Sequence, residues 1–134
     1  MNLQEAYKQI ISDFIEATKS ENIVWKKQNP TTYFVEALSK DSQAIVSIQK
    51  VITKITSVKT SMGQIVKRNP ITNYLFTVKN PTTKENIINL DTNQEGEYLQ
   101  ALNELFNLIE YNFEMRNIEF LKGIIENIKK HEQE

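Results

Sequence analysis

The chain opens with a pattern of apolar and polar positions that predicts an amphipathic helix. Apolar residues recur at steps of three and four: Leu3, Tyr7, Ile10, Ile11, Phe14 and Ala17. Asn2 and Glu5 have capping-box spacing, in which two polar side chains satisfy the first turn of a helix. We therefore expect a helix from Leu3 to about Lys19.

From Ile23 onward the apolar residues form short runs rich in valine, isoleucine and aromatic residues, a pattern typical of β-strands. The expected strands are residues 23–27, 32–38, 44 to about 53, 74–79 and 85–90. Asn-Pro dipeptides begin at Asn29, Asn69 and Asn80 and separate these runs. Because proline removes a donor from a strand ladder, we expect ordinary turns there and an antiparallel meander.

The segment 44–62 allows two interpretations. Its apolar residues fit a helical stripe, yet it is crowded with Val, Ile, Thr and Ser, which favour strands. We favour a strand that pairs with residues 32–38 through a polar turn at 39–42, followed by a long loop from about 56 to 71. A helix over residues 42–61 is the alternative.

The C-terminal third predicts a long amphipathic helix. Thr92 and Glu95 have capping-box spacing. The apolar stripe that follows consists of Leu99, Leu102, Phe106, Ile109 and Phe113. It loses phase across residues 114–117 and resumes with Ile118, Leu121, Ile125 and Ile128. We expect a kink or a break into two helices at 114–117.

Together these elements predict a single α+β domain over residues 1–134. It comprises an N-terminal helix, an antiparallel meander of four or five strands, and a long or broken C-terminal helix, each burying its one apolar side against the others. Tyr33 and Val35 would share one sheet face, and Phe34 and Leu38 the other. Both faces should therefore be partly covered, by helices on opposite sides or by a second copy, so we expect homodimerisation through a sheet or helix surface.

Three sequence segments carry a resemblance. They are Glu-Ala-Thr-Lys-Ser at 16–20, Ile-Val-Trp-Lys at 23–26, and Leu-Asp-Thr at 90–92, which leads into a helix containing Tyr98, Leu99 and Leu102. In this order they resemble a loose group of small bacterial and phage proteins built as helix, β-meander and helix, although residues 53–72 are longer here. The resemblance implies the architecture and carries over no functional residue. Fourteen lysines against two arginines suit an AT-rich genome, which fits the same setting.

The composition removes the parts of most common catalytic sites. The chain has no cysteine, so disulfides, thiolate nucleophiles and cysteine metal sites are excluded. Its one histidine, His131, lies in a charged C-terminal tail where we expect it to be solvated and idle, and its three glycines form no phosphate loop. We therefore expect no enzyme activity, no metal and no small-molecule cofactor. No run of about 18 apolar residues and no N-terminal signal pattern occur, so we expect a cytoplasmic protein without membrane association.

Charge is distributed unevenly along the chain. Residues 1–41 carry a net charge of -1, residues 42–84 carry seven cations and no acid, and residues 85–134 carry -7. Candidate binding residues in the basic segment are Lys50, Lys54, Lys59, Lys67 and Arg68. Trp25 could stack on a base, although a lone tryptophan at the start of a small sheet is more often a core anchor.

The basic segment has three interpretations: neutralisation by the acidic C-terminal helix of the same or a second copy, an acidic protein partner, or nucleic acid held through its phosphates. We expect a non-catalytic protein–protein interaction protein, such as a small inhibitor, immunity or accessory factor of a bacterium or phage. The alternative is a nucleic-acid-binding module that uses residues 42–84. The scarcity of arginine would make such a module tolerant of sequence, because arginine is the preferred reader of guanine edges.

Overall fold

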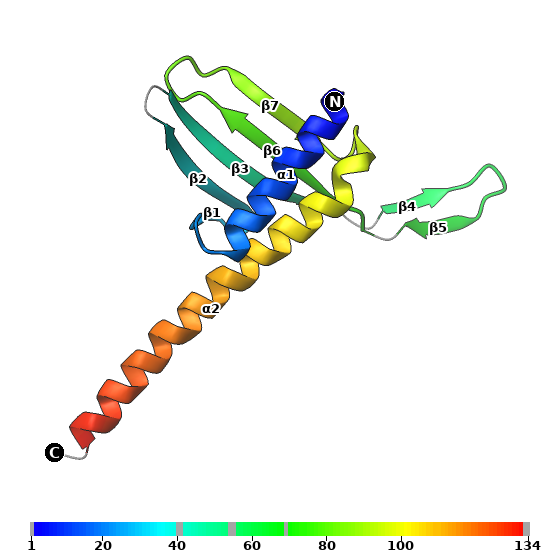
Figure 1. Cartoon of the computed structure of the whole chain (residues 1–134). Coiled ribbons are helices and arrows are strands. Elements are labelled where there is room, and N and C mark those ends of the chain that lie inside the picture. The colour runs from blue at the N-terminus through cyan, green and yellow to red at the C-terminus, as the bar shows by residue number, and fades with distance from the viewer. Residues whose placement is uncertain (1, 40–41, 54–55, 69, 133–134) are drawn as a thin grey trace.

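The structure of the chain is a computed structural model that describes residues 2–39, 42–53, 56–68 and 70–132 (Figure 1). The helices are α1 (Leu3–Lys19) and α2 (Leu99–Glu132), the second preceded by the 3-10 turn η1 (Gly96–Tyr98). The strands are β1 (Lys26–Asn29), β2 (Thr32–Ser39), β3 (Ser42–Ile52), β4 (Thr56–Lys59), β5 (Ile65–Arg68), β6 (Thr72–Lys79) and β7 (Asn86–Asp91). An N-terminal helix, a five-stranded antiparallel sheet and a long C-terminal helix confirm the predicted α+β fold.

The N-terminal helix has the predicted bounds and the predicted cap. The side-chain oxygen of Asn2 accepts a 2.8 Å hydrogen bond from the amide of Glu5. After α1 the chain turns through Glu21 at φ 59, and the amide of Ile23 bonds back to the carbonyl of Ala17. Because this turn occupies the backbone of Ile23, β1 begins only at Lys26, and the predicted strand at 23–27 was placed too early.

The main sheet is an antiparallel meander in the order β1-β2-β3-β6-β7. Two of its turns show the Asn-Pro chemistry that the sequence predicted. The side chain of Asn29 accepts the amide of Thr31 at 3.0 Å, and that of Asn80 accepts the amide of Thr82 at 2.9 Å. Asn69, in the third dipeptide, lies outside the described residues, as do residues 40 and 41 of the predicted turn at 39–42.

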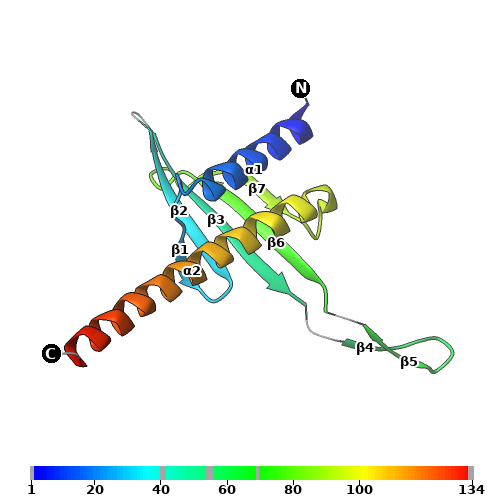
Figure 2. The same cartoon turned by 60° about the horizontal axis from the view of Figure 1, so that its bottom comes forward.

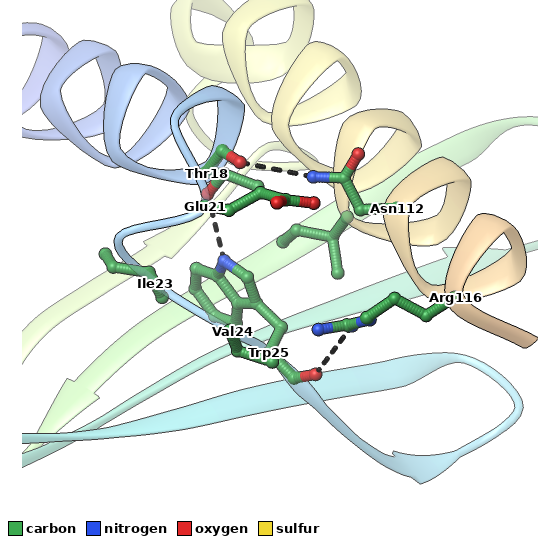
Figure 3. A pocket seen from close by; sticks show the side chains of 8 residues that line it. Thr18, Glu21, Ile23, Val24, Trp25, Asn112 and Arg116 are labelled. Carbon is green, nitrogen blue, oxygen red and sulfur yellow. Dashed lines mark hydrogen bonds between the residues drawn. The ribbon is translucent and has the colours of Figure 1, made fainter. Parts of the chain in front are cut away.

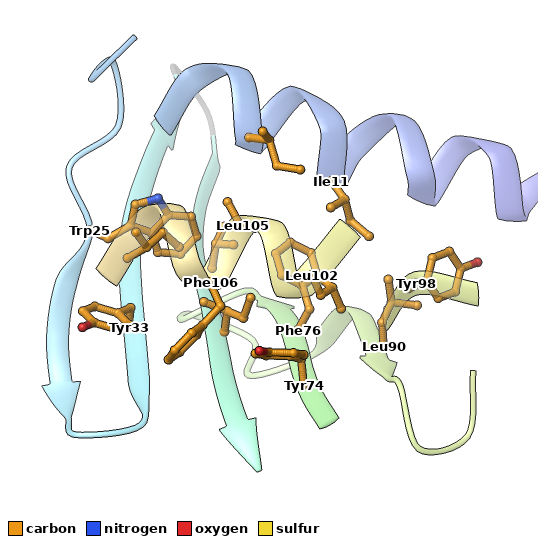
Figure 4. Close-up of a cluster of buried hydrophobic side chains, with 14 of the residues drawn as sticks. Ile11, Trp25, Tyr33, Tyr74, Phe76, Leu90, Tyr98, Leu102, Leu105 and Phe106 are labelled. Atoms are coloured by element: carbon orange, nitrogen blue, oxygen red, sulfur yellow. The ribbon is translucent and has the colours of Figure 1, made fainter. Parts of the chain in front are cut away.

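Both helices cover one face of the sheet, and the core lies between them and this face (Figures 1, 2 and 4). A buried row crosses the four strands β2, β3, β6 and β7 through the paired residues Tyr33, Ile48, Phe76 and Leu90. The helices contribute Ile11, Ile15, Leu102, Leu105, Phe106 and Ile109 to the same cluster. Burying these one-sided apolar patterns against each other is the main source of stability of the fold.

Of the two alternatives for covering both sheet faces, helices on opposite sides were wrong, because both described helices lie on the same face; cover by a second copy stays a prediction. On the far face Phe34 is only partly buried and stands beside Ser47, whose hydroxyl lies 2.6 Å from that of Thr77 on the next strand. Val51, which is 43% exposed, and the partly buried Leu75 share this face, so the far face is mixed in polarity and part of its apolar surface meets solvent.

The middle of the chain confirms one prediction and corrects another. The segment at 42–52 is the strand β3, so the alternative helix over 42–61 was wrong. The loop expected from 56 to 71 is instead the hairpin β4–β5, which forms a separate two-stranded sheet.

The C-terminal helix differs from its prediction in two places, at its start and at residues 114–117. It begins with η1 at Gly96, later than the expected start, because the Thr92 hydroxyl accepts the amide of Tyr74 at 2.9 Å within the sheet instead of capping a helix. It continues without a break to Glu132, so the expected kink at 114–117 was wrong. The stripe changes phase there because α2 leaves the body: from Asn117 every described side chain is exposed. Neither helix contains an apolar stretch long enough for a membrane span.

Candidate functional site

Two elements project from the body of the protein. One is the hairpin β4–β5, and the other is the last part of α2, residues 117–132, which we call the outer helix. They leave the body at opposite ends (Figures 1 and 2). Both present large apolar side chains to solvent, which makes them candidates for contact with another molecule.

Hydrogen bonds between Thr53 and Ile71 mark the point where the chain leaves the sheet for the hairpin and returns to it. The amide of Thr53 donates to the carbonyl of Ile71 at 2.9 Å, and the amide of Ile71 donates to the Thr53 hydroxyl at 3.0 Å. The same hydroxyl donates back to the Ile71 carbonyl at 3.2 Å. These bonds join the ends of β3 and β6, so the hairpin departs from a defined point of the sheet.

The tip of the hairpin is a tight turn between Thr60 and Gln64. The amide of Thr60 donates to the carbonyl of Gln64 at 2.8 Å, and the amide of Gly63 donates to the carbonyl of Thr60 at 2.9 Å. Gly63 has a φ of 80°, the left-handed conformation that closes a three-residue hairpin loop. The turn thereby fixes the position of the side chains around it.

Met62 and Ile65 are the exposed apolar side chains of this turn. Their side chains are 85% and 72% exposed. Sequence reasoning missed both because it treated the segment as a loop. The signal was present, since β-branched residues at Val58, Ile65 and Val66 lie on either side of a loop that contains Gly63.

Only part of the predicted cationic set belongs to the hairpin. Lys59 is exposed at the end of β4, and Lys67 and Arg68 lie in β5, where their backbones pair with Ser57 and Thr56. Lys54 lies outside the described residues.

Lys50 belongs to a different place in the fold. It lies in β3 on the covered face of the sheet, and its Nζ is 5.6 Å from the ring centroid of Phe106. A cation over an aromatic face is a favourable contact within the protein. Lys50 is therefore half-buried against the core and does not extend the basic surface of the hairpin.

Trp25 is a core anchor, and the interpretation of it as a stacking platform for a base was wrong. Its side chain is 3% exposed, and its indole nitrogen donates to the Thr18 hydroxyl at 3.0 Å (Figure 3). Asn112 and Arg116 of α2 bond to the carbonyls of Thr18 and Trp25 at 3.1 and 3.4 Å. The cavity at this junction measures about 10 Å³, room for one water molecule at most.

Within the described side chains, the acidic segment does not neutralise Lys59, the described cation of the hairpin. Among the side chains that the structure describes, no ion pair joins residues 42–84 to residues 85–132; the described pair is Lys19 with Glu16 at 3.6 Å. The outer helix also runs away from the hairpin (Figure 1). The positive charge of Lys59 therefore faces solvent.

An open depression of about 380 Å³ lies where the hairpin meets the body. Thr72, Tyr74, Leu99 and Asn103 are among its lining residues. The Tyr74 hydroxyl donates to the Asn103 side chain at 2.6 Å, and burial, with a smaller contribution from Glu110, raises the pKa of Tyr74. Tyr74 thus stays neutral, and its hydroxyl is already bonded to Asn103. A partner could fit into this depression by shape but would find few unpaired polar groups there.

The outer helix carries a second apolar surface. Ile118, Leu121, Ile124, Ile125 and Ile128 are between 40% and 55% exposed, and Phe120 beside them is 70% exposed. We call the first five residues the outer stripe. His131 has an exposed side chain in the last turn of this helix.

Within the described ranges, no three His, Cys, Asp or Glu side chains come together to hold a metal ion. No family model, no curated protein and no solved structure matches the chain. Function is therefore inferred from the residues of this chain alone.

Proposed function

We propose that this protein is a non-catalytic binding protein of the bacterial or phage cytoplasm, which inhibits, protects or assists a protein partner held by the β4–β5 hairpin. The observation that carries the proposal is the exposure of Met62 and Ile65 at the tip of a hairpin whose charged residues are all cations. The fixed turn presents these side chains without the ordering cost that a loose loop would have on binding.

The hairpin suits a partner with an apolar pocket surrounded by acidic groups. Met62 is a flexible apolar side chain of the kind found at protein-binding surfaces, and it would fill the pocket. The exposed Lys59 would steer the hairpin toward a negative surface. Exposed apolar tips are costly in water, so a partner that buries them gains affinity.

The test is capture of a partner from an extract of the encoding organism after nuclease digestion, comparing three forms of the full chain. We expect the wild type and the control Ile87→Ser to retain the same partner, because Ile87 is 57% exposed on β7, away from the hairpin. The double variant Met62→Ser with Ile65→Ser should lose it. Equal retention by all three forms would refute the role of the hairpin.

Nucleic acid is the second candidate, and the acid-free stretch of residues 42–84 favours it. Two-stranded ribbons with cationic side chains enter the grooves of DNA, and such binding weakens steeply with salt. A mobility-shift titration at low and high salt distinguishes the candidates. A shift at low salt that Lys59→Glu weakens and Met62→Ser leaves unchanged would favour nucleic acid over the protein partner.

A further inference from the structure

The outer helix is amphipathic on its own, with an arrangement independent of the core. On a helix of 3.6 residues per turn the outer stripe occupies about a third of the circumference. The rest of the circumference carries charged or small residues: Glu119, Lys122, Gly123, Glu126, Lys129 and Lys130; Glu132 falls in line with the outer stripe at its C-terminal end. Such a division is typical of a helix that buries one side against another element.

No element of this chain covers the outer stripe in the described structure. Ile118 follows the buried Ile109 by nine residues, about two and a half turns, so the two side chains point in opposite directions. The helix has also passed the edge of the sheet at this point (Figure 2). The side chain of Ile118 is consequently 43% exposed and that of Ile128 is 53% exposed.

The outer helix has the properties of a helix that needs a partner. Its sixteen residues form a rod about 24 Å long, only just above the ~12–15 residues below which an isolated helix is marginal in water. Side chains of this size carry on the order of 150 Å² each, so the half-exposed stripe and Phe120 present several hundred Å² of apolar surface. This area is sufficient for the apolar centre of an interface of ordinary size, about 800 Å² per partner, with the polar flanks as its rim.

The charges of the outer helix identify the occupant. Residues 117–132 contain three acids and three lysines, a net charge of zero with His131 neutral. A helix that binds an anionic membrane has a strongly basic polar side, which is absent here. A balanced helix is compatible with a copy of itself, because neither copy imposes a net repulsion on the other.

The order of these charges also sets the direction of packing. Within the outer helix Glu119 lies in the first turn, and Lys129 and Lys130 lie in the last turn. Antiparallel helices would bring these two lysines of one copy beside Glu119 of the other, whereas parallel helices would place like charges together. Antiparallel packing also aligns the helix dipoles favourably.

We propose that two copies of this chain associate through their outer helices, packed antiparallel along the outer stripe. In the register centred between Ile124 and Ile125, Ile124 of one copy faces Ile125 of the second copy. In the same register Leu121 faces Ile128 of the second copy. In this register the overlap spans the whole outer helix. The C-terminal end of each helix therefore lies near the folded body of the other copy. The hairpins stay outside the contact, at the far ends of the two bodies.

The first test measures the mass of the full chain in solution by light scattering. We expect twice 15.6 kDa for the wild type. Ile125→Glu should give the mass of one chain, because it places a charge in the centre of the contact. Asn127→Glu adds the same charge two residues later, about 200° around the helix, and should remain dimeric. Fluorescence of the buried Trp25 reports that the body of each variant is folded.

The second test determines direction, using the absence of native cysteine. Leu121→Cys and Ile128→Cys are prepared as separate chains and then mixed under oxidising conditions. Antiparallel packing predicts a disulfide between the two different variants and little within either alone. Disulfides that form equally within each variant alone would refute the antiparallel arrangement.

Three outcomes would overturn the proposal outright: a wild-type mass of one chain across a concentration series, a dimer that survives Ile125→Glu, or a monomer that sediments with vesicles of mixed neutral and anionic phospholipid. The inference does not depend on the proposed function. Loss of a partner in Met62→Ser with Ile65→Ser leaves the dimer intact, and loss of the dimer leaves the hairpin unchanged.

Discussion

The indole nitrogen of Trp25 donates a 3.0 Å hydrogen bond to the hydroxyl of Thr18, which in turn donates a 2.7 Å bond to the carbonyl of Phe14. Both side chains are buried, at 3% and 1% exposure. The bond therefore connects the last turn of α1 to the chain that enters the sheet. It also places Trp25 where Arg116 of α2 reaches its carbonyl.

Replacing Thr18 by valine tests this junction. Valine keeps the shape of the side chain but leaves the buried indole N–H without an acceptor, which should lower the free energy of unfolding by about 1–3 kcal/mol. Urea denaturation measures the change. Ser20→Ala is the control, because it removes an exposed hydroxyl bonded to a carbonyl of the same helix and should change stability by less than about 0.5 kcal/mol. Equal effects of the two substitutions would contradict the structural role of the Trp25 bond.

Two buried tyrosines of the core should respond oppositely to loss of their hydroxyls. Within the described part of the chain the buried hydroxyl of Tyr33 has no hydrogen-bond partner, whereas that of Tyr74 donates to Asn103 at 2.6 Å. Tyr33→Phe should leave the free energy of unfolding unchanged or raise it, since it removes an unsatisfied polar atom. Tyr74→Phe should lower it by about 0.5–1.5 kcal/mol. Urea denaturation curves, with equal slopes for the wild type and the variants, measure both changes. A larger loss of unfolding free energy in Tyr33→Phe than in Tyr74→Phe would contradict this assignment of the two hydroxyls.

Stability should fall in alkaline solution. Burial, chiefly, raises the pKa of Tyr33, Tyr74 and Tyr98 above the ordinary value, and neighbouring glutamates raise it further. The unfolded chain therefore loses these protons first, near pH 10, while the folded chain retains them. Since the folded state then binds more protons, the free energy of unfolding decreases as pH rises through this value and is unaffected by these groups below it.

Urea midpoints from about pH 8 to pH 11 measure that decline. Tyr98→Phe removes one of the three groups, so the decline should be shallower than in the wild type. Comparison of the two chains cancels every contribution to the pH dependence that is common to both. An identical decline would show that Tyr98 is not a source of the pH dependence.

Several features could be predicted because a single local pattern determines them. The capping of Glu5 by Asn2 follows from spacing within one helical turn, and the faces of β2 follow from strict alternation around Tyr33. Burial of Trp25 followed from the size of its side chain and its place before the first strand. These are local preferences that agree with the tertiary structure.

The remaining features depend on contacts that the sequence pattern does not identify. The phase change after Phe113 correctly indicated a change of environment, yet pattern alone does not distinguish a kink from a straight helix that leaves its core. Thr92 had the spacing of a helix cap, but its hydroxyl is used by Tyr74 and Asn73 of the neighbouring strand. The charge pattern of the sequence has the same limit. Lys50 and Lys59 belong to one basic segment, but the fold places Lys50 against the ring of Phe106 and leaves Lys59 exposed to solvent.

Gly63 should control the hairpin independently of the core. At φ 80 a Cβ would meet no atom within 4 Å, so Gly63→Ala has only a backbone cost, about 1–2 kcal/mol for the left-handed conformation. Hydrogen exchange at the Thr60 amide, which donates to Gln64, should quicken accordingly, whereas the urea midpoint of the whole chain should not move. Gly63→Asn should exchange more slowly than the alanine variant, because asparagine tolerates this conformation better. Slower exchange in Gly63→Ala than in the wild type would refute the turn geometry, and a partner held by Met62 should bind the alanine variant more weakly than the asparagine variant.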